Sequence, residues 1–451
     1  MEFCNKKVLV LGAGISGRSV ADVLARQGAC VTLNDVKAMD IRKEEFYQLQ
    51  AQGITLVFGH QQETLLEGTD YVVVSPGISI YIPLIQTARS QNITVMSEIE
   101  VAYQLCKAPV IAITGTNGKT TTTTLTGEML KAAGKAAVVG GNIGLALSHE
   151  VMGVDETGIV VAEISSFQLE SIIDFKPYIA AVLNVTPDHL DRHRAMDEYQ
   201  RTKERIFANQ RGSEYLILNY DDIAVRNMAQ RALSQVVYFS ASQELQNGAY
   251  VKEGLLQMNW QGQNHMICSV EEMKLFGRHN VENALASCCA AWLMGVSTAA
   301  MSRVLRSFTG VEHRIEPVAT VNGVTYYNDS KATNPESAIK ALEAFTGHVV
   351  LIAGGRDKNT DLTELMALAR EKVDHLILIG EARARFAAGA QAAGVNLIHC
   401  TGSMEEAVQL AHRLAQAPQI VLLSPACASY DMFANYEERG RAFKQLVCRL
   451  A

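Results

Sequence analysis

Short apolar runs recur along the chain, and most of them end in glycine or polar residues that lead into a helix-like segment. In the N-terminal part these runs occupy residues 7–11, 30–33, 54–58, 71–75 and 93–96. Runs of four to six mainly aliphatic residues that alternate with helical periodicity are typical of a parallel sheet covered by helices. The pattern therefore predicts an α/β fold built from βαβ units.

The same alternation continues in two further blocks. The central block has apolar runs at residues 110–113, 158–162 and 179–183, and the last block has runs at 324–327, 348–353, 375–379 and 420–423. Between them, residues 214–273 predict a small antiparallel excursion. We expect three domains, which are an N-terminal Rossmann-like half (1–99), a central P-loop ATPase-type parallel sheet (100–310) and a C-terminal doubly wound Rossmann-like domain (311–451).

The central block opens with a candidate phosphate-binding loop, in which the run 110–113 continues into Gly115-Thr-Asn-Gly-Lys-Thr120 and a predicted helix. Its backbone N–H groups and the helix N-terminus favour phosphate, Lys119 can reach the β and γ phosphates, and Thr120 can ligate Mg²⁺. The spacing G-x-x-G-K-T is shorter than the usual pattern, which would require glycine in place of Ile113. The alternative is an ordinary strand-to-helix turn with a solvated lysine.

Near the N-terminus, Gly12-Ala-Gly14-Ile-Ser-Gly17 follows the first apolar run, and Asp35 ends the second. A G-x-G-x-x-G turn with an acidic residue about twenty positions later is the fingerprint of dinucleotide binding and by itself suggests NAD. Only one mononucleotide-binding half fits before the phosphate loop, so a nucleoside diphosphate is the better expectation. A glycine turn that serves only helix packing is the alternative.

Polar residues gather where the central strands end. Glu163 ends the strand after the phosphate loop and is our first candidate for a Mg²⁺ ligand. For His189 a loop histidine and a metal ligand are both open, and for Lys203, on a predicted helix, an ordinary surface lysine is open as well. Asn283 either contacts a base edge or only caps its helix.

In the last block, the strand ends carry further polar and basic residues. Lys358 follows a Gly-Gly turn and Ser429 follows the run at 420–423. Because the carboxyl ends of parallel strands form one crevice, these residues can hold an anionic substrate. A solvated Lys358 is the alternative.

Composition limits the function classes. The chain has 451 residues, 48% of them hydrophobic, and a formal charge of −7. No basic stripe suggests nucleic acid, no apolar run reaches the 18 or more residues of a membrane helix, and no signal-peptide pattern precedes the first strand. The nine cysteines are scattered without a C-x-x-C pair, so we expect reduced thiols and a cytoplasmic location.

Taken together, these segments resemble the Mur ligases, and the resemblance covers the whole chain. It rests on the segments Thr114-Gly-Thr-Asn-Gly-Lys-Thr-Thr121, Glu163-Ile-Ser-Ser-Phe-Gln-Leu-Glu170, Asp188-His-Leu-Asp191, Gly277-Arg-His-Asn280, His313-Arg314 and Asn328-Asp-Ser-Lys-Ala-Thr-Asn334. Within the family, Ser75-Pro-Gly-Ile78, the 328–334 segment and residues 424–433 are most similar to members that add D-glutamate to UDP-N-acetylmuramoyl-L-alanine. The shortened phosphate loop is a family feature.

The resemblance implies an ATP-dependent amide-bond ligase of peptidoglycan precursor synthesis, and hence a role in cell shape and division. ATP would phosphorylate the alanine carboxylate, and the amine of D-glutamate would then displace phosphate from the acyl phosphate. It also implies two Mg²⁺ ions and a carbamylated Lys203, since a carbamate turns this cation into a carboxylate. We expect a monomer without membrane insertion.

The resemblance further assigns site residues. Triphosphate and metal contacts fall on Gly115, Thr116, Asn117, Gly118, Lys119, Thr120, Thr121, Glu163, His189 and Lys203, and further ATP contacts on Asn283, Arg314 and Asp329. Uridine diphosphate contacts fall on Gly14, Ser16, Asp35, Lys37, Ser75 and Gly77, and muramoyl-alanine contacts on Asn142 and Gln168. Glutamate contacts fall on Lys331, Thr333, Lys358, Ser429 and Tyr436, although some family members have phenylalanine in place of Tyr436.

Other function classes fit parts of the chain. An NAD-dependent oxidoreductase would explain the first glycine turn but neither the phosphate loop nor the last block. A nucleotide-dependent switch would bind ATP without substrate-dependent phosphate release. Folylpolyglutamate synthase shares the ATPase core but lacks the N-terminal βαβ domain, so residues 1–98 argue against it.

Overall fold

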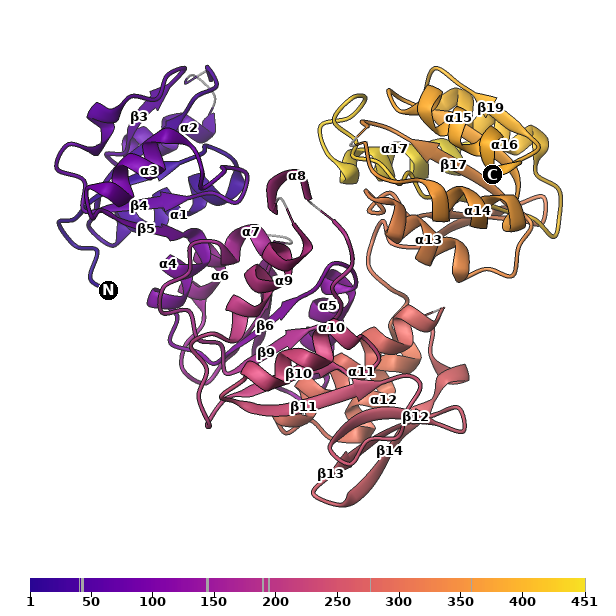
Figure 1. Cartoon of the computed structure of the whole chain (residues 1–451), viewed down its shortest axis with the longest axis horizontal. Coiled ribbons are helices and arrows are strands. Elements are labelled where there is room, and N and C mark those ends of the chain that lie inside the picture. The colour runs from indigo at the N-terminus through magenta and orange to yellow at the C-terminus, as the bar shows by residue number, and fades with distance from the viewer. Residues whose placement is uncertain are drawn as a thin grey trace. The chain divides into compact units, whose positions relative to one another are not determined.

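The computed structural model describes residues 1–39, 41, 44–142, 146–188, 190–193, 195–275, 277–357 and 359–450. It confirms a three-domain α/β fold with three separate sheets (Figure 1). The chain forms two compact units, residues 1–272 with 282–306 and residues 273–281 with 307–451, so the first unit holds two of the sheets. We refer to these two compact units as the first and second unit.

The N-terminal sheet is entirely parallel, in the order β3-β2-β1-β4-β5. Its strands are β1 Lys7–Leu11, β2 Cys30–Asp35, β3 Thr55–Phe58, β4 Tyr71–Val74 and β5 Thr94–Ser97. Its helices are α1 Ile15–Arg26, α2 Glu44–Ala51, η1 Glu63–Leu66, α3 Pro83–Ser90 and α4 Glu98–Leu105. Successive residues of β1 point to opposite faces, where Val8 packs with α1 and α2 and Leu9 packs with α3.

The nine-stranded central sheet has the order β14-β13-β12-β11-β10-β9-β6-β8-β7. Its strands are β6 Val110–Thr114, β7 Ala137–Gly141, β8 Ile159–Glu163, β9 Ile179–Val182, β10 Tyr215–Asn219, β11 Gln235–Ser240, β12 Gly248–Lys252, β13 Leu255–Trp260 and β14 Gln263–Ser269. The longer helices around it are α5 Lys119–Ala132, α9 Met196–Glu204, α11 Arg278–Leu293 and α12 Thr298–Ser307. The short ones are α6 Leu147–Glu150, η2 Val151–Gly153, α7 Ser166–Leu169, α8 Leu190–His193, η3 Arg205–Phe207, α10 Ile223–Arg226, η4 Asn227–Arg231 and η5 Val270–Glu272.

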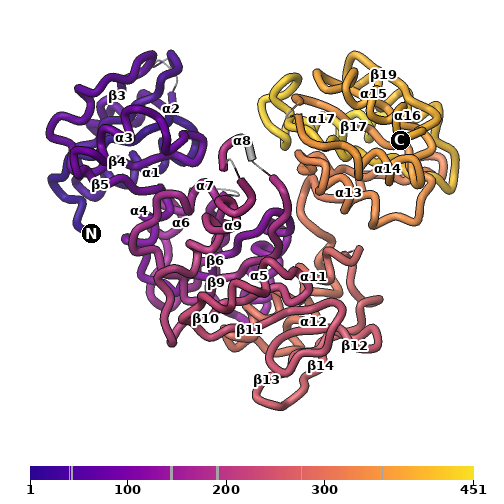
Figure 2. Tube along the Cα trace, in the orientation of Figure 1, coloured from indigo at the N-terminus to yellow at the C-terminus, as the bar shows by residue number. Residues whose placement is uncertain are grey.

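The expected antiparallel excursion is only partly correct. Strands β10, β11 and β12 extend the parallel sheet, and only β12-β13 and β13-β14 pair antiparallel. A run of short strands gives the same apolar pattern whether the strands pair parallel or antiparallel, because the direction of pairing depends on the connections between strands, which periodicity does not report. Figure 2 follows this path of the chain through the first unit.

The sheet of the second unit has the order β15-β16-β20-β17-β18-β19 and is parallel except for the pair β15-β16. Its strands are β15 Glu316–Val321, β16 Val324–Asn328, β17 Val349–Gly354, β18 Val373–Ile379, β19 Ile398–Cys400 and β20 Ile420–Leu423. Its helices are α13 Pro335–Glu343, α14 Thr363–Lys372, α15 Arg383–Ala393, α16 Met404–Leu414 and α17 Tyr436–Cys448. Helices α13, α14 and α15 pack on one face and α16 and α17 on the other, as a doubly wound domain requires.

Candidate functional site

The phosphate loop lies between the buried strand β6 and the helix α5, as the sequence predicts. Gly118 precedes α5 with a φ of +84°, a left-handed conformation that favours glycine. A Cβ at this position would lie 2.2 Å from the side-chain oxygen of Asn283, on α11. Position 118 therefore requires glycine, and Asn283 lies directly against the loop.

Thr120 and Glu163 meet above the loop. The Thr120 hydroxyl donates to Glu163 Oε2 at 2.7 Å, and Asn142 Nδ2 donates to Glu163 Oε1 at 2.9 Å. Glu163 is 1% exposed and ends β8, which pairs with β6 so that Ile113 lies beside it. A carboxylate and a hydroxyl at this spacing are hard oxygen donors of the kind that Mg²⁺ prefers, so these residues fit the expected metal.

Two lysine ammonium groups converge on one carbonyl oxygen of the loop. Lys119 Nζ donates to the oxygens of Gly115 and Thr116, both at 2.8 Å, and Lys203 Nζ donates to the same Gly115 oxygen at 2.9 Å. Lys203 is 1% exposed and lies 4.3 Å from the centre of the Tyr199 ring. The interpretation of Lys203 as a surface lysine is therefore wrong.

Burial is the main cause that lowers the pKa of Lys203 well below its ordinary value, and the neighbouring charge of Lys119 lowers it further. The charge of Asp188 opposes this shift. A lowered pKa increases the fraction of neutral amine, and only the neutral amine is a nucleophile.

Asn184 contacts the phosphate loop from the segment that follows the neighbouring strand β9. Its Oδ1 accepts the N–H of Asn117 at 2.8 Å, and its Nδ2 donates to the Asn117 oxygen at 3.1 Å. The Thr116 hydroxyl, in turn, donates to the Thr186 oxygen at 3.1 Å. Sequence reasoning assigned no role to Asn184, because the adjacency of β9 and β6 is set by the strand order.

The other assigned residues of the central sheet differ in their surroundings. Gln168 is 1% exposed, and its side-chain oxygen accepts the Ser165 N–H in the capping box of α7. Thr121 is buried in α5, and its hydroxyl makes no hydrogen bond to the described residues. His189 and Lys358 lie outside the described residues.

The N-terminal glycine turn is held by two polar residues. Both carboxylate oxygens of Asp35 accept backbone N–H groups, from Ala13 and Lys37 at 2.9 Å each. The Ser75 hydroxyl donates to the Gly12 oxygen at 3.0 Å, which brings the loop after β4 onto the turn. The structure thus brings Asp35 and Ser75 to one end of the sheet.

The remaining residues assigned to the uridine diphosphate lie around this turn. Gly14, Lys37 and Gly77 are exposed, and Ser16 is half-buried at the start of α1. A Cβ would meet nothing within 4 Å at Gly14 or Gly77. The surface at these two glycines is therefore open to a ligand.

In the second unit, Asp329 follows β16 and is buried. Its Oδ2 accepts the Ser424 hydroxyl at 2.7 Å, and its Oδ1 accepts the Ile315 N–H at 3.2 Å. Burial raises the pKa of Asp329 to about 7, while the Ser424 hydrogen bond and the charge of Arg314 oppose this shift. Asp329 thus exchanges a proton near neutral pH.

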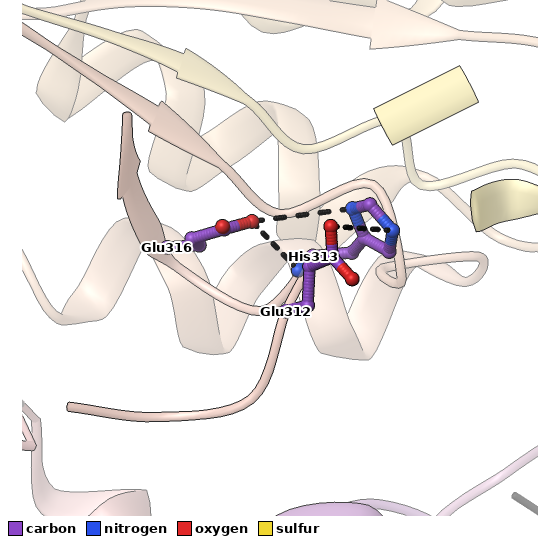
Figure 3. Close-up of side chains that lie close together, drawn as sticks. All are labelled: Glu312, His313 and Glu316. Carbon is purple, nitrogen blue, oxygen red and sulfur yellow. Dashed lines mark hydrogen bonds and ion pairs between the residues drawn. The ribbon is translucent and has the colours of Figure 1, made fainter. Parts of the chain in front are cut away.

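Arg314 is presented by a strained segment, since the flanking residues His313 and Ile315 have φ values of +67° and +43°. Figure 3 shows His313 with Glu312 and Glu316. The N–H of His313 donates to Glu316 Oε2 at 2.9 Å, and Asn328 Nδ2 donates to His313 Nδ1 at 2.9 Å. This network holds the segment in its strained conformation.

The same cluster has the side chains of a metal site, and in the described part of the chain it is the one such group of three. However, Lys444 Nζ donates to Glu316 and, at 3.0 Å, to Glu312 Oε1. A lysine cation already bridges both carboxylates, so we interpret the cluster as structural.

The candidate glutamate residues lie at strand ends of the second unit. Lys331 Nζ lies 5.3 Å from the centre of the Tyr436 ring, and the Lys331 N–H donates to the His313 oxygen at 3.0 Å. Thr333 is half-buried between Lys331 and α13. Ser429 is 2% exposed and lies in the segment after β20.

Comparison with known proteins covers the whole chain. Three family models match, described as "Mur ligase MurD-like, N-terminal domain" (residues 6–97), "Mur ligase middle domain" (113–291) and "Mur ligase, glutamate ligase domain" (313–427). The UDP-N-acetylmuramoylalanine--D-glutamate ligase of Thermoanaerobacter sp. (strain X514) is 46% identical over 452 residues, with 100% of both chains covered. The protein of the same name from Pelotomaculum thermopropionicum is 45% identical, with 100% of this chain and 99% of the relative covered.

Solved structures confirm the fold. The pseudomurein peptide ligase type C from Methanothermus fervidus superposes with a TM-score of 0.63 at 18% identity, and 99% of this chain and 100% of that chain are covered. MurF ligase from Thermotoga maritima in complex with ADP gives 0.61 at 16% identity, with 100% of this chain and 97% of that chain covered. No helix among the described residues is long and apolar enough to cross a membrane.

Proposed function

The chain belongs to the Mur ligase family, and on this premise we propose that it is the ATP-dependent ligase that joins D-glutamate to UDP-N-acetylmuramoyl-L-alanine. The observation that carries the proposal is the contact between Thr120 and Glu163 above the phosphate loop, in a chain that matches D-glutamate ligases from end to end. Membership of this family argues against the alternative of an NAD-dependent oxidoreductase.

ATP binding follows from the geometry of the loop. Its N–H groups and the N-terminus of α5 favour the phosphates, and Lys119 would exchange the oxygens of Gly115 and Thr116 for phosphate oxygens. Thr120 and Glu163 would hold Mg²⁺, which neutralises charge on the phosphates when it is bound. Asn283 lies close enough to the loop to contact the nucleotide.

The proposed reaction has two steps, formation of an acyl phosphate and its aminolysis. An oxygen of the alanine carboxylate attacks the γ-phosphorus of ATP, and ADP leaves as the acyl phosphate forms. The amine of D-glutamate then attacks the acyl carbon, loses a proton, and inorganic phosphate leaves as the amide forms. The chain contributes positioning and charge neutralisation, since neither step needs a covalent link to the protein.

Substrate positions follow the same assignment. We place the uridine diphosphate at the N-terminal glycine turn and the muramoyl-alanine end near Asn142 and Gln168. Arg314 and Asp329 would contact ATP. D-glutamate would be framed by Lys331, Thr333, Lys358, Ser429 and Tyr436.

We further propose that Lys203 is a carbamate in the active enzyme. Its neutral amine adds to CO₂ and loses a proton, which leaves an N–H that can still donate to the Gly115 oxygen. The new carboxylate would lie near Lys119, whose charge stabilises it, and would offer oxygen to a second Mg²⁺ together with His189. The buried position and the lowered pKa of Lys203 support this proposal.

The test is phosphate release with ATP, Mg²⁺ and UDP-N-acetylmuramoyl-L-alanine while the amino acid is varied. D-glutamate should support turnover, whereas L-glutamate, D-aspartate, lysine and diaminopimelate should not. Equal rates with all five amino acids would overturn the assigned substrate. Phosphate release at the same rate when no amino acid is added would overturn the ligase reaction.

A further inference from the structure

A half-buried arginine joins the N-terminal sheet to the central sheet within the first unit. Arg192 lies on α8 with 13% of its side chain exposed. Its two terminal nitrogens donate to the carbonyl oxygens of Pro76 and Ile78, both at 2.8 Å. A planar guanidinium with fixed N–H directions holds two such carbonyls at a fixed separation, which a single ammonium group cannot do.

The same guanidinium is anchored on the central side. Its Nε donates to Glu170 Oε1 at 3.0 Å, and one terminal nitrogen donates to Glu170 Oε2 at 2.5 Å, so the pair is bidentate. Glu170 is 6% exposed and directly follows α7. The guanidinium carbon also lies 4.2 Å from the centre of the Phe167 ring. These contacts use four of the five N–H groups of Arg192.

The loop that receives these bonds is the one assigned to the uridine diphosphate. Ser75 fastens it to the Gly12 oxygen, and a Cβ at Gly17 would lie only 2.7 Å from the Ser75 hydroxyl. A second tie lies further along the chain, where the Tyr81 hydroxyl donates to Glu198 Oε1 at 2.6 Å. Glu198 belongs to α9, the helix that carries Lys203.

A series of neighbouring residues connects the proposed metal ligand Glu163 to the substrate loop. Glu163 ends β8, α7 and Glu170 follow within seven residues, and Arg192 connects Glu170 to the loop after β4. We propose that Arg192, oriented by Glu170, is a positioning residue that fixes the UDP-substrate loop relative to the phosphate loop. It acts through the Pro76 and Ile78 carbonyls, and the inference rests on the proposed function for the identity of the substrate.

Three variants test the inference. Arg192→Met removes the hydrogen bonds but retains a long side chain, and Arg192→Lys retains the charge but not the fork. Arg205→Met is the matched control, because Arg205 also donates to backbone carbonyls near α7, those of Leu169 at 2.7 Å and Ile172 at 2.8 Å, without reaching the loop.

Two readouts are measured for each variant. The first is the KM for UDP-N-acetylmuramoyl-L-alanine beside the KM for ATP, with calorimetry of uridine diphosphate alone. The second is backbone hydrogen exchange across residues 75–79, which needs no turnover.

We expect Arg192→Met to raise the KM for the UDP substrate at least about tenfold, because two hydrogen bonds from a charged donor are lost, and to leave the KM for ATP within about twofold. Exchange across 75–79 should accelerate, Arg192→Lys should recover only part of either effect, and Arg205→Met should match the wild type in both. Unchanged exchange and an unchanged KM in Arg192→Met would overturn the inference. If the wild type fails to use D-glutamate, the proposed function fails, and the exchange data still decide the role of Arg192.

Discussion

At the scale of single residues, Lys119 separates ATP chemistry from binding of the UDP substrate. Its ammonium belongs to the phosphate loop on the central sheet, whereas the uridine diphosphate is assigned to the N-terminal sheet. We therefore expect Lys119→Ala to abolish turnover and to leave the affinity for the UDP substrate unchanged by calorimetry, since distant sites act independently. An equal loss of that affinity would contradict the placement of the substrate.

Lys203 gives a sharper test, because a carbamate and a structural ammonium predict opposite results. Lys203→Ala should be nearly inactive but partly rescued by acetate, which can supply the missing oxygen ligand. Lys203→Arg should stay inactive, because guanidinium remains charged and cannot add CO₂. Phosphate release is measured for both variants with and without acetate, and an active Lys203→Arg enzyme would exclude the carbamate.

The raised pKa of Asp329 predicts a pH dependence of stability. With a pKa of about 7 in the folded state and 3.8 as the ordinary value, the folded state binds the proton more tightly. Stability from this group is therefore complete below about pH 4 and is lost as the pH rises to about 7, by at most about 1.4 kcal/mol per pH unit.

Asp329→Asn removes this titration, because an amide does not ionise in this pH range. The amide can still accept the Ile315 N–H, and it can donate to the Ser424 hydroxyl. The difference in free energy of unfolding between the variant and the wild type, measured with urea, should grow from pH 5 to pH 7 and then level off. A difference that does not vary with pH would mean that Asp329 keeps an ordinary pKa.

Strand-end reasoning predicted a Glu163 site beside the phosphate loop, and the structure brings Glu163 and Thr120 together at 2.7 Å. It did not predict Asn184 or Arg192, because their partners depend on strand order and on the path of loops. It also did not decide whether Lys203 is a surface lysine or a site residue, since the burial of a helix residue depends on which face the helix turns to the core.

At the scale of elements, the turn into α5 depends on glycine. Gly118→Ala would place a Cβ 2.2 Å from the Asn283 oxygen, in addition to the cost of a left-handed alanine of about 1–2 kcal/mol. Gly134, just after α5, is a matched control with a φ of +75° and no heavy atom within 4 Å of the added Cβ.

We expect Gly134→Ala to lower the free energy of unfolding by about 1 kcal/mol without changing the KM for ATP. Gly118→Ala should cost more stability and raise the KM for ATP, because the clash displaces the loop or Asn283. Thermal unfolding and the KM for ATP are measured for both variants. Equal effects of the two substitutions would refute the close approach of Asn283.

The apolar runs predicted most strands of all three sheets, but they missed β7, β15 and β19. Only one residue of β15 is fully buried and none of β19, so their apolar signal is weak. The segment 98–108 between the first two sheets begins with α4, where Glu98 and Glu100 are buried. Glu100 accepts the N–H groups of Ile173 and Phe175, a long-range partnership that local sequence does not show.

At the scale of the whole molecule, the chain combines three sheets, and we propose that they serve, in chain order, the UDP substrate, ATP and the incoming amino acid. The fold class and the order of these sheets followed from periodicity, glycine turns and the resemblance to the Mur ligases. The domain boundaries at residues 99 and 310 remain predictions, as do the roles of the residues assigned to each ligand.

Transfer of oxygen tests the central claim most directly. UDP-N-acetylmuramoyl-L-alanine with heavy oxygen in its alanine carboxylate is incubated with ATP, Mg²⁺ and D-glutamate, and both products are analysed by mass spectrometry. An acyl phosphate predicts that one labelled oxygen appears in inorganic phosphate and that the UDP product gains one glutamate. A glutamate-containing product with unlabelled phosphate would contradict the acyl phosphate, and phosphate release without any gain of glutamate would contradict the ligase itself.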